Sequence, residues 1–115
     1  RVVEHALEKG VDGLGWTCLS DEDHGRKRWV TVAPTGGGTG LVLALPMTER
    51  QSAALGRQTG DRVGFFLESR DFVADAGRII AAGGTFLEAP RREPYGKVAQ
   101  WRDPWGNLWD LIQRP

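Results

Sequence analysis

Hydrophobic and polar residues alternate with a period of two near the end of the chain, over residues 98–103 and again over 108–112. Such alternation is typical of β-strands that bury one face. Residues 103–107, Asp-Pro-Trp-Gly-Asn, have the composition of a tight turn, because Asp can bond the backbone two residues on and Pro fixes φ. Gly106 and Asn107 are the residues expected to adopt positive φ. The pattern predicts a β-hairpin.

The same signals predict strands upstream of this hairpin. Alternation and β-forming residues mark them at residues 16–20, 28–33, 41–45, 63–69 and 85–88. Residues 41–45 are wholly apolar, which is typical of a strand buried on both faces. Residues 90–95 are mostly polar or charged and are expected to form a loop.

Two segments have the patterns of helices. Residues 1–10 are amphipathic and end at a glycine, which is a common helix stop. A second helix is expected from Phe72 to about Ala82, with Asp71 as its N-cap. Its buried stripe is expected to contain Phe72, Ala76, Ile79 and Ile80.

The order of these elements repeats along the chain. Residues 63–115 have the order strand, helix, strand, strand, strand, and residues 1–45 have the same order without the opening strand. Residues 46–62 form a linker in which one or two helical turns are expected. Since 115 residues fit one compact domain, the two units are expected to be modules of a single domain over residues 1–115.

The closing hairpin resembles that of the vicinal oxygen chelate superfamily, the glyoxalase, bleomycin-resistance and extradiol-dioxygenase group. Members commonly end with Asp-Pro-x-Gly-Asn-x-x-Glu-Leu, and residues 103–111 match this motif with Asp110 in place of the glutamate. Residues 63–72, 81–86 and 88–96 resemble the family's second module in the same order. The resemblance implies an α+β fold in which paired βαβββ modules form one cupped mixed sheet around a cavity, here with the opening strand of the first module absent.

Charge and composition argue against several classes of partner. Lys and Arg together number 15 and so do Asp and Glu, so no net field favours nucleic acid or an anionic membrane. No apolar run reaches the ~18 residues of a transmembrane helix. Cys18 is the single cysteine, which suits a reducing compartment. We therefore expect a cytoplasmic protein with no nucleic acid and no membrane as partner.

Enzymes of the resembled family hold a divalent cation with side chains from four strands, typically two His and two Glu. By this resemblance one ligand falls on the absent strand, one on residues 41–45, which offer no donor, one near Gly64, and the last at Asp110. His5 and His24 lie in the first helix and in a charged turn, where solvated side chains are expected. One carboxylate cannot replace the three or more protein ligands that such an ion needs. No metal and no other cofactor is therefore expected.

Asp110 is the best candidate for a catalytic or binding residue, because an unpaired carboxylate is costly to bury in an otherwise apolar strand. It is expected to line the main cavity, with its pKa raised by burial. Glu68 either shares this cavity or lies at the rim of the sheet, in water or paired with an arginine.

Aromatic side chains on the inner face of a curved sheet can stack flat or cationic ligands. Trp29, Phe66 and Trp101 are the candidates for this role. Arg92 and Tyr95 lie in the loop that borders the cavity in the resembled fold, so they either close over a ligand or are simply solvated.

These observations favour a metal-free protein that binds a small-molecule ligand, and the resemblance to bleomycin-resistance proteins implies drug sequestration. The alternative is a metal-dependent lyase or dioxygenase of the same superfamily, with Asp110 as a metal ligand or general base. A non-catalytic subunit that acts through its interface is a third class. Since the absent strand would leave a bare sheet edge, a homodimer is expected.

Overall fold

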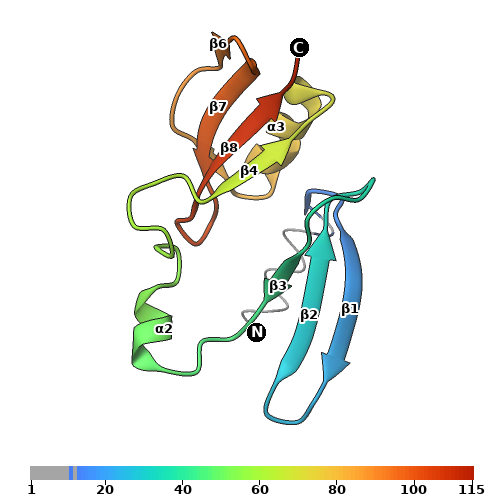
Figure 1. Ribbon diagram of the computed structural model, residues 1–115, viewed down its shortest axis with the longest axis vertical. Helices are drawn as coiled ribbons and strands as arrows, with labels where there is room; N and C mark the ends of the chain where they lie inside the picture. The colour runs from blue at the N-terminus through green and yellow to red at the C-terminus, as the bar shows by residue number, and fades with distance from the viewer. Residues whose placement is uncertain (1–10, 12) are drawn as a thin grey trace. The chain divides into compact units, whose positions relative to one another are not determined.

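The computed structural model describes residues 11 and 13–115, which fall into two compact units (Figure 1). The first unit ends at Met47, and the second contains the rest of the chain. The helix expected over residues 1–10, with His5, lies outside the described residues. Over the described part of the chain, none of the helices combines the length and hydropathy that a membrane crossing requires.

The first unit contains an antiparallel sheet in the order β1-β2-β3. Its strands are β1 (Thr17–Asp23), β2 (Arg28–Ala33) and β3 (Leu41–Leu43). Val30 and Val32 form its buried core, and their cross-strand partners Leu43 and Leu41 pack against them. The expectation that β3 is buried on both faces is wrong, because Val42 points the other way and is 51% exposed.

The second unit contains a mixed sheet in the order β4-β8-β7-β5, and β6 also pairs with β7. Its elements are α2 (Glu49–Ala53), β4 (Phe65–Glu68), α3 (Phe72–Ala81), β5 (Thr85–Phe86), β6 (Arg91–Glu93), β7 (Gly96–Arg102) and β8 (Leu108–Gln113). β4 is parallel to β8, and the other pairs are antiparallel. β5 and β6 pair with opposite ends of β7, so together they take the place of a single strand that is interrupted between them. The unit therefore has the expected βαβββ order after α2.

The fold is α+β, as expected. Among the described residues, however, the hydrogen-bonded ladders form two sheets, one in each unit, rather than one continuous sheet. The predicted loop at residues 90–95 is also partly wrong, because β6 lies within it and pairs with β7 through a short turn.

The predicted closing hairpin is confirmed. Asp103 Oδ1 accepts hydrogen bonds from the backbone N–H groups of Trp105 and Asn107, each at 2.9 Å. Gly106 has a φ of 104°, as expected of a turn glycine. Asn107 does not have positive φ, so that part of the prediction is wrong. The side chain of Asp103 holds the turn instead.

Helix α3 begins where its cap predicts. Asp71 accepts a hydrogen bond from the backbone N–H of Ala74 at 3.1 Å. Phe72 and Ile79 are buried, but Ile80 is 60% exposed. The buried face of α3 is therefore narrower than predicted, and the inclusion of Ile80 in it is wrong. Successive residues of an α-helix are rotated by about 100°, which turns Ile80 away from the face that carries Ile79.

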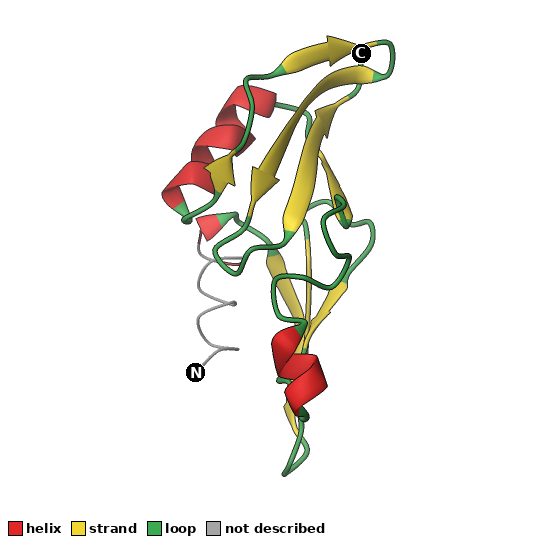
Figure 2. Ribbon diagram, turned by 90° about the vertical axis from the view of Figure 1, so that its left-hand side faces the viewer, coloured by secondary structure: helices red, strands yellow, loops and turns green. Residues whose placement is uncertain are grey.

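The core of the second unit lies between α3 and one face of the sheet, and Figure 2 shows α3 along that side. The Trp101 and Trp109 rings stack with centroids 5.1 Å apart, and Phe86 lies 6.5 Å from Trp101. Farther along this face, Gln113 Oε1 accepts a hydrogen bond from the Phe72 N–H at 2.7 Å. The rings of Trp101, Trp109 and Phe86 therefore belong to the hydrophobic core under α3.

The segment after α2 packs closely against the turn of the closing hairpin. Gly56 has a φ of +73°, and a Cβ built on it would lie 1.8 Å from the carbonyl oxygen of Trp105. Only glycine allows this backbone approach. The contact fixes the start of the second unit to the end that carries Asp103.

Candidate functional site

Asp110 lies on the face of the second sheet that is opposite to α3. In the strand register it is paired with Phe66 of β4 and Gln100 of β7. Directly paired residues project from the same face, so these three side chains form one row across the strands. The Phe66 side chain is 64% exposed, whereas Asp110 is 9% exposed. An exposed aromatic ring therefore lies in the same row as a buried carboxyl group.

Burial raises the pKa of the Asp110 carboxyl above its usual value of 3.8. Arg91 opposes this shift and lowers that pKa, while Glu88 raises it further. Val98 and Ile112, which form the neighbouring row, are 0% and 2% exposed. Because these apolar side chains cannot solvate the charge, the expected direction of the shift is found.

Glu88 and Arg91 form a charged pair beside this row. Glu88 Oε2 accepts hydrogen bonds from the backbone N–H of Gln100, at 2.8 Å, and from Arg91 Nη1. Arg91 Nε donates to Glu93 Oε1 at 3.3 Å. Hydrogen bonds to Glu88 and then to Tyr95 raise the pKa of the Arg91 guanidinium above its usual value. Arg91 is therefore a permanent cation next to Asp110.

Sequence reasoning did not identify Glu88 or Arg91 as site residues. Arg91 pairs with Val98, and Val98 pairs with Ile112, so its side chain projects from the face that carries Asp110. Recognising residues 91–93 as a strand would have revealed this, because alternation then separates Arg91 from Arg92.

Two predicted site residues lie on the other face of the sheet. Trp101 is paired with Trp109 and is 3% exposed in the core under α3, so the expectation that it shares a pocket with Asp110 is wrong. Arg92 is paired with Lys97, which lies over the Phe72 ring of α3. It is Arg91 that lies on the Asp110 face.

Glu68 was predicted either to share the cavity with Asp110 or to lie at the rim of the sheet, and the structure shows the second. Its Oε1 atom accepts a hydrogen bond from Arg114 Nε at 2.8 Å, and the side chain is 64% exposed. It therefore lies at the rim of the sheet, paired with an arginine.

Trp29 and Tyr95 are accessible to solvent. Trp29 lies on β2 of the first unit and is 48% exposed. Tyr95 lies in the turn between β6 and β7, is 44% exposed, and forms a side-chain hydrogen bond with Arg91. Ligand stacking by Trp29 and closure by Tyr95 stay predictions.

A pocket of about 690 Å³ lies in the second unit, but Asp110 does not line it. Its walls come from the start of α3, the turn between β6 and β7, and the end of β8. This pocket therefore does not test the expectation that Asp110 lines the main cavity, which stays a prediction. Asp110 instead lies at the centre of a sheet face.

The donor set around Asp110 does not fit a divalent metal. Glu88, the nearby carboxylate, already accepts from Arg91 and from Gln100. Gly64, the position expected to carry a ligand by resemblance, has no side chain. Within residues 11 and 13–115, no group of three or more His, Cys, Asp or Glu side chains is arranged to hold a metal ion.

The substitution Asp110→Asn should raise the melting temperature at pH 7. The folded state binds the Asp110 proton more tightly than the unfolded chain, so stability from this group is full below the unfolded pKa and is lost as pH rises through the folded pKa. The difference between variant and parent should shrink as pH falls toward 3.8, the usual value. Thermal unfolding across this range measures it, with the exposed Asp61→Asn as control. A melting temperature lowered at pH 7 would contradict the pKa direction.

Comparisons with known proteins agree with this architecture. Residues 11–111 match the family profile of the Glyoxalase/Bleomycin resistance protein/Dioxygenase superfamily. An uncharacterized protein from Shewanella frigidimarina (strain NCIMB 400) is 43% identical over 113 residues, which cover 96% of this chain and 84% of the relative.

Two solved structures are similar to this chain over almost all of its length. One is TnmS3, an antibiotic binding protein from Streptomyces sp. CB03234, with 30% identity, a TM-score of 0.75, and coverage of 100% of this chain and 88% of that chain. The other is a member of the glyoxalase/bleomycin resistance protein/dioxygenase superfamily from Sphaerobacter thermophilus DSM 20745, with 28% identity, a TM-score of 0.74, and coverage of 97% and 88%. The chain belongs to the Glyoxalase/Bleomycin resistance protein/Dioxygenase superfamily.

Proposed function

We propose that this protein binds and sequesters an aromatic, antibiotic-like small molecule, without a metal ion, at the row formed by Phe66, Asp110 and Gln100. The observation that carries the proposal is the exposed Phe66 ring next to a buried carboxyl of raised pKa. The similarity to TnmS3, described as an antibiotic binding protein, supports the same class of ligand.

The chemistry of the row suits a flat ligand that carries a polar group. An aromatic ring stacked on Phe66 gains about 0.5–1.5 kcal/mol beyond its area burial. Because its pKa is raised, Asp110 retains its proton to higher pH than an ordinary aspartate, and a protonated carboxyl both donates and accepts hydrogen bonds. Arg91 adds a fixed positive charge on the same face.

The alternative of a metal-dependent lyase or dioxygenase requires more donors than the described residues of this unit supply around Asp110. Cytoplasmic location and homodimer formation stay predictions from the sequence.

The proposal is tested by titrating a ¹⁵N-labelled sample with aromatic antibiotics, bleomycin among them, in the presence of EDTA. We expect amide shifts centred on Phe66, Gln100 and Asp110. Phe66→Ala should weaken binding about tenfold, because it removes the stacking surface. Ile80→Ala is the control, since Ile80 is also an exposed hydrophobic residue, at 60%, but lies on α3.

Three outcomes would contradict the proposal. In the first, none of the antibiotics binds. In the second, binding disappears in EDTA, which would favour a metal-dependent site. In the third, Phe66→Ala binds as well as the parent protein, so the ligand lies elsewhere.

A further inference from the structure

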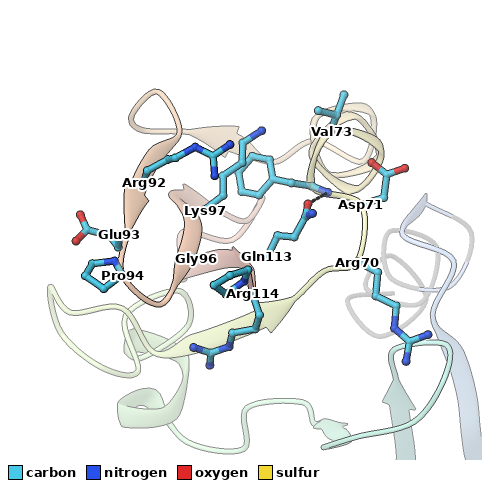
Figure 3. Close-up of a pocket in the computed structure, with 12 residues that line it drawn as sticks. Arg70, Asp71, Val73, Arg92, Glu93, Pro94, Gly96, Lys97, Gln113 and Arg114 are labelled. Atoms are coloured by element: carbon cyan, nitrogen blue, oxygen red, sulfur yellow. Dashed lines mark hydrogen bonds between the residues drawn. The ribbon is translucent and has the colours of Figure 1, made fainter.

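The pocket of about 690 Å³ in the second unit is rich in cationic side chains (Figure 3). It lies on the α3 side of the sheet, on the opposite face from Asp110. Its charged lining residues are the cations Arg70, Arg92, Lys97 and Arg114 and the acids Asp71 and Glu93. The lining therefore has an excess of positive charge although the whole chain is neutral.

Both acids of the pocket lining and one of its cations already form hydrogen bonds to other groups. Asp71 caps α3 by accepting from the Ala74 N–H at 3.1 Å. Glu93 accepts from Arg91 at 3.3 Å, and Arg114 donates to Glu68 at 2.8 Å. Figure 3 shows the Arg70 and Arg114 side chains extending away from the space between β6 and α3. These groups do not neutralise the centre of the pocket.

Arg92 and Lys97 form the centre of the positive charge. They are direct cross-strand partners on β6 and β7, and Figure 3 shows both side chains extending toward α3. Like charges directly opposite each other destabilise a sheet. Within the described part of the chain, neither makes an ion pair with an acid. Among the described residues, two adjacent cations thus lie in this pocket without an ion-pair partner.

An apolar surface accompanies the two cations. Lys97 Nζ lies 4.6 Å from the centroid of the Phe72 ring, a cation–π contact that positions its ammonium group. Pro94 and Val73 also line the pocket, and Val73 is 72% exposed. The Phe72 N–H is already bound to Gln113, so the side chains rather than the helix start supply the free donors.

We propose that this pocket is a second ligand site, which binds the anionic group of a small organic molecule, a carboxylate or a phosphate monoester, between Arg92 and Lys97. The guanidinium fork matches the two oxygens of such a group, and the ammonium adds a point charge. The apolar part of the ligand lies against Phe72, Val73 and Pro94. The site is independent of the proposed antibiotic site, because its residues lie on the other face of the sheet.

Calorimetric and NMR titrations at constant ionic strength test the site with four probes: phenyl phosphate, benzoate, inorganic phosphate and the neutral benzyl alcohol. We expect phenyl phosphate and benzoate to bind with amide shifts at Phe72, Lys97 and Gln113, and inorganic phosphate to bind more weakly. Benzyl alcohol should not bind. In a separate series in which the ionic strength is raised with sodium chloride, binding should weaken, because screening acts on exposed charges.

Charge-removing variants locate the anion. Arg92→Gln and Lys97→Gln should each weaken phenyl phosphate binding at least about fivefold. Arg92→Lys and Lys97→Arg should recover part of the affinity, which separates loss of charge from loss of folding. Arg102→Gln, an equal charge change at an exposed position of the same strand, should leave affinity unchanged. Phe66→Ala should also leave the affinity for phenyl phosphate unchanged, so that the proposal of this site and the proposal of the antibiotic site can be rejected independently.

The proposal is overturned if benzyl alcohol binds as well as phenyl phosphate, if Arg92→Gln retains full affinity, or if Arg102→Gln weakens binding equally. The last result would mean diffuse attraction by surface charge rather than a site.

Discussion

Replacing Trp101 with alanine should lower the free energy of unfolding by about 3–5 kcal/mol, the cost of truncating a buried large aromatic side chain. Trp101 is 3% exposed and stacks on Trp109 with centroids 5.1 Å apart and planes inclined by 19°. A Cβ built on Gly84 would lie 2.5 Å from the Ile79 side chain of α3 and 3.2 Å from the Trp101 ring, so the chain leaves no room there for a side chain on Gly84. The alanine variant would leave a cavity where the helix meets the sheet.

Urea denaturation followed by circular dichroism measures this loss. Phe66→Ala is the matched control, because Phe66 lies on the same sheet but is 64% exposed, and surface changes are usually within about 0.5 kcal/mol. Trp101→Phe should cost less than alanine, since it keeps a ring and removes an indole N–H that is buried with no hydrogen-bond partner in the described structure. Equal losses for Trp101→Ala and Phe66→Ala would place Trp101 outside the core.

The elements that the sequence predicted well have strong local signals. β2 lies at residues 28–33, as alternation predicted, and α3 begins after its Asp71 cap. The closing hairpin has turn chemistry at residues 103–107 that fits few other conformations. In each case the side chains nearby in sequence determine the backbone, so no knowledge of tertiary contacts was needed.

β6 was not predicted, because its three residues, Arg91 to Glu93, are all charged and contain no apolar alternation. It is a strand because β7 supplies its hydrogen bonds. This omission changed the predicted site. Without the strand, Arg92 was assigned to the cavity, whereas the pairing puts Arg91 beside Asp110 and Arg92 beside Lys97.

The candidate site was predictable only in part. Asp110 was found because an acid stands out in an apolar strand, and its burial follows from the neighbouring Ile112 and Val98. Which residue of β7 faces Asp110 depends on the register across the hairpin turn, and that residue is Gln100 rather than Trp101. A slip of one residue moves a whole strand to the other face, so aromatic composition alone could not assign Trp101.

Asp103→Ala should lower the free energy of unfolding by about 2–4 kcal/mol, because hydrogen bonds to a charged group are each worth about 1.5–3 kcal/mol and several are lost together. Oδ1 accepts from the Trp105 and Asn107 backbone N–H groups at 2.9 Å each. Oδ2 accepts from Asn107 Nδ2 at 3.0 Å and Trp109 Nε1 at 3.1 Å. One carboxylate thus ties the turn to the strand that carries Asp110.

Asp103→Asn separates the two halves of this network. Its amide oxygen can still accept from the two backbone N–H groups, but its NH₂ group then meets two donors, Asn107 Nδ2 and Trp109 Nε1. We therefore expect the free energy of unfolding of Asp103→Asn to lie between those of the parent protein and Asp103→Ala. Asp61→Ala, which removes the same charge from an exposed linker position, should be nearly neutral.

Hydrogen exchange of the β7 and β8 amides, measured with urea denaturation, shows where stability is lost. If the Asp103 carboxylate holds the hairpin, protection should fall first at Arg102 and Leu108, the pair next to the turn. If Asp103→Ala unfolds like Asp61→Ala, the β7–β8 ladder alone fixes the register, and the turn contributes little. In that case the pairing of Asp110 with Gln100 would rest on side-chain packing across the sheet rather than on the turn.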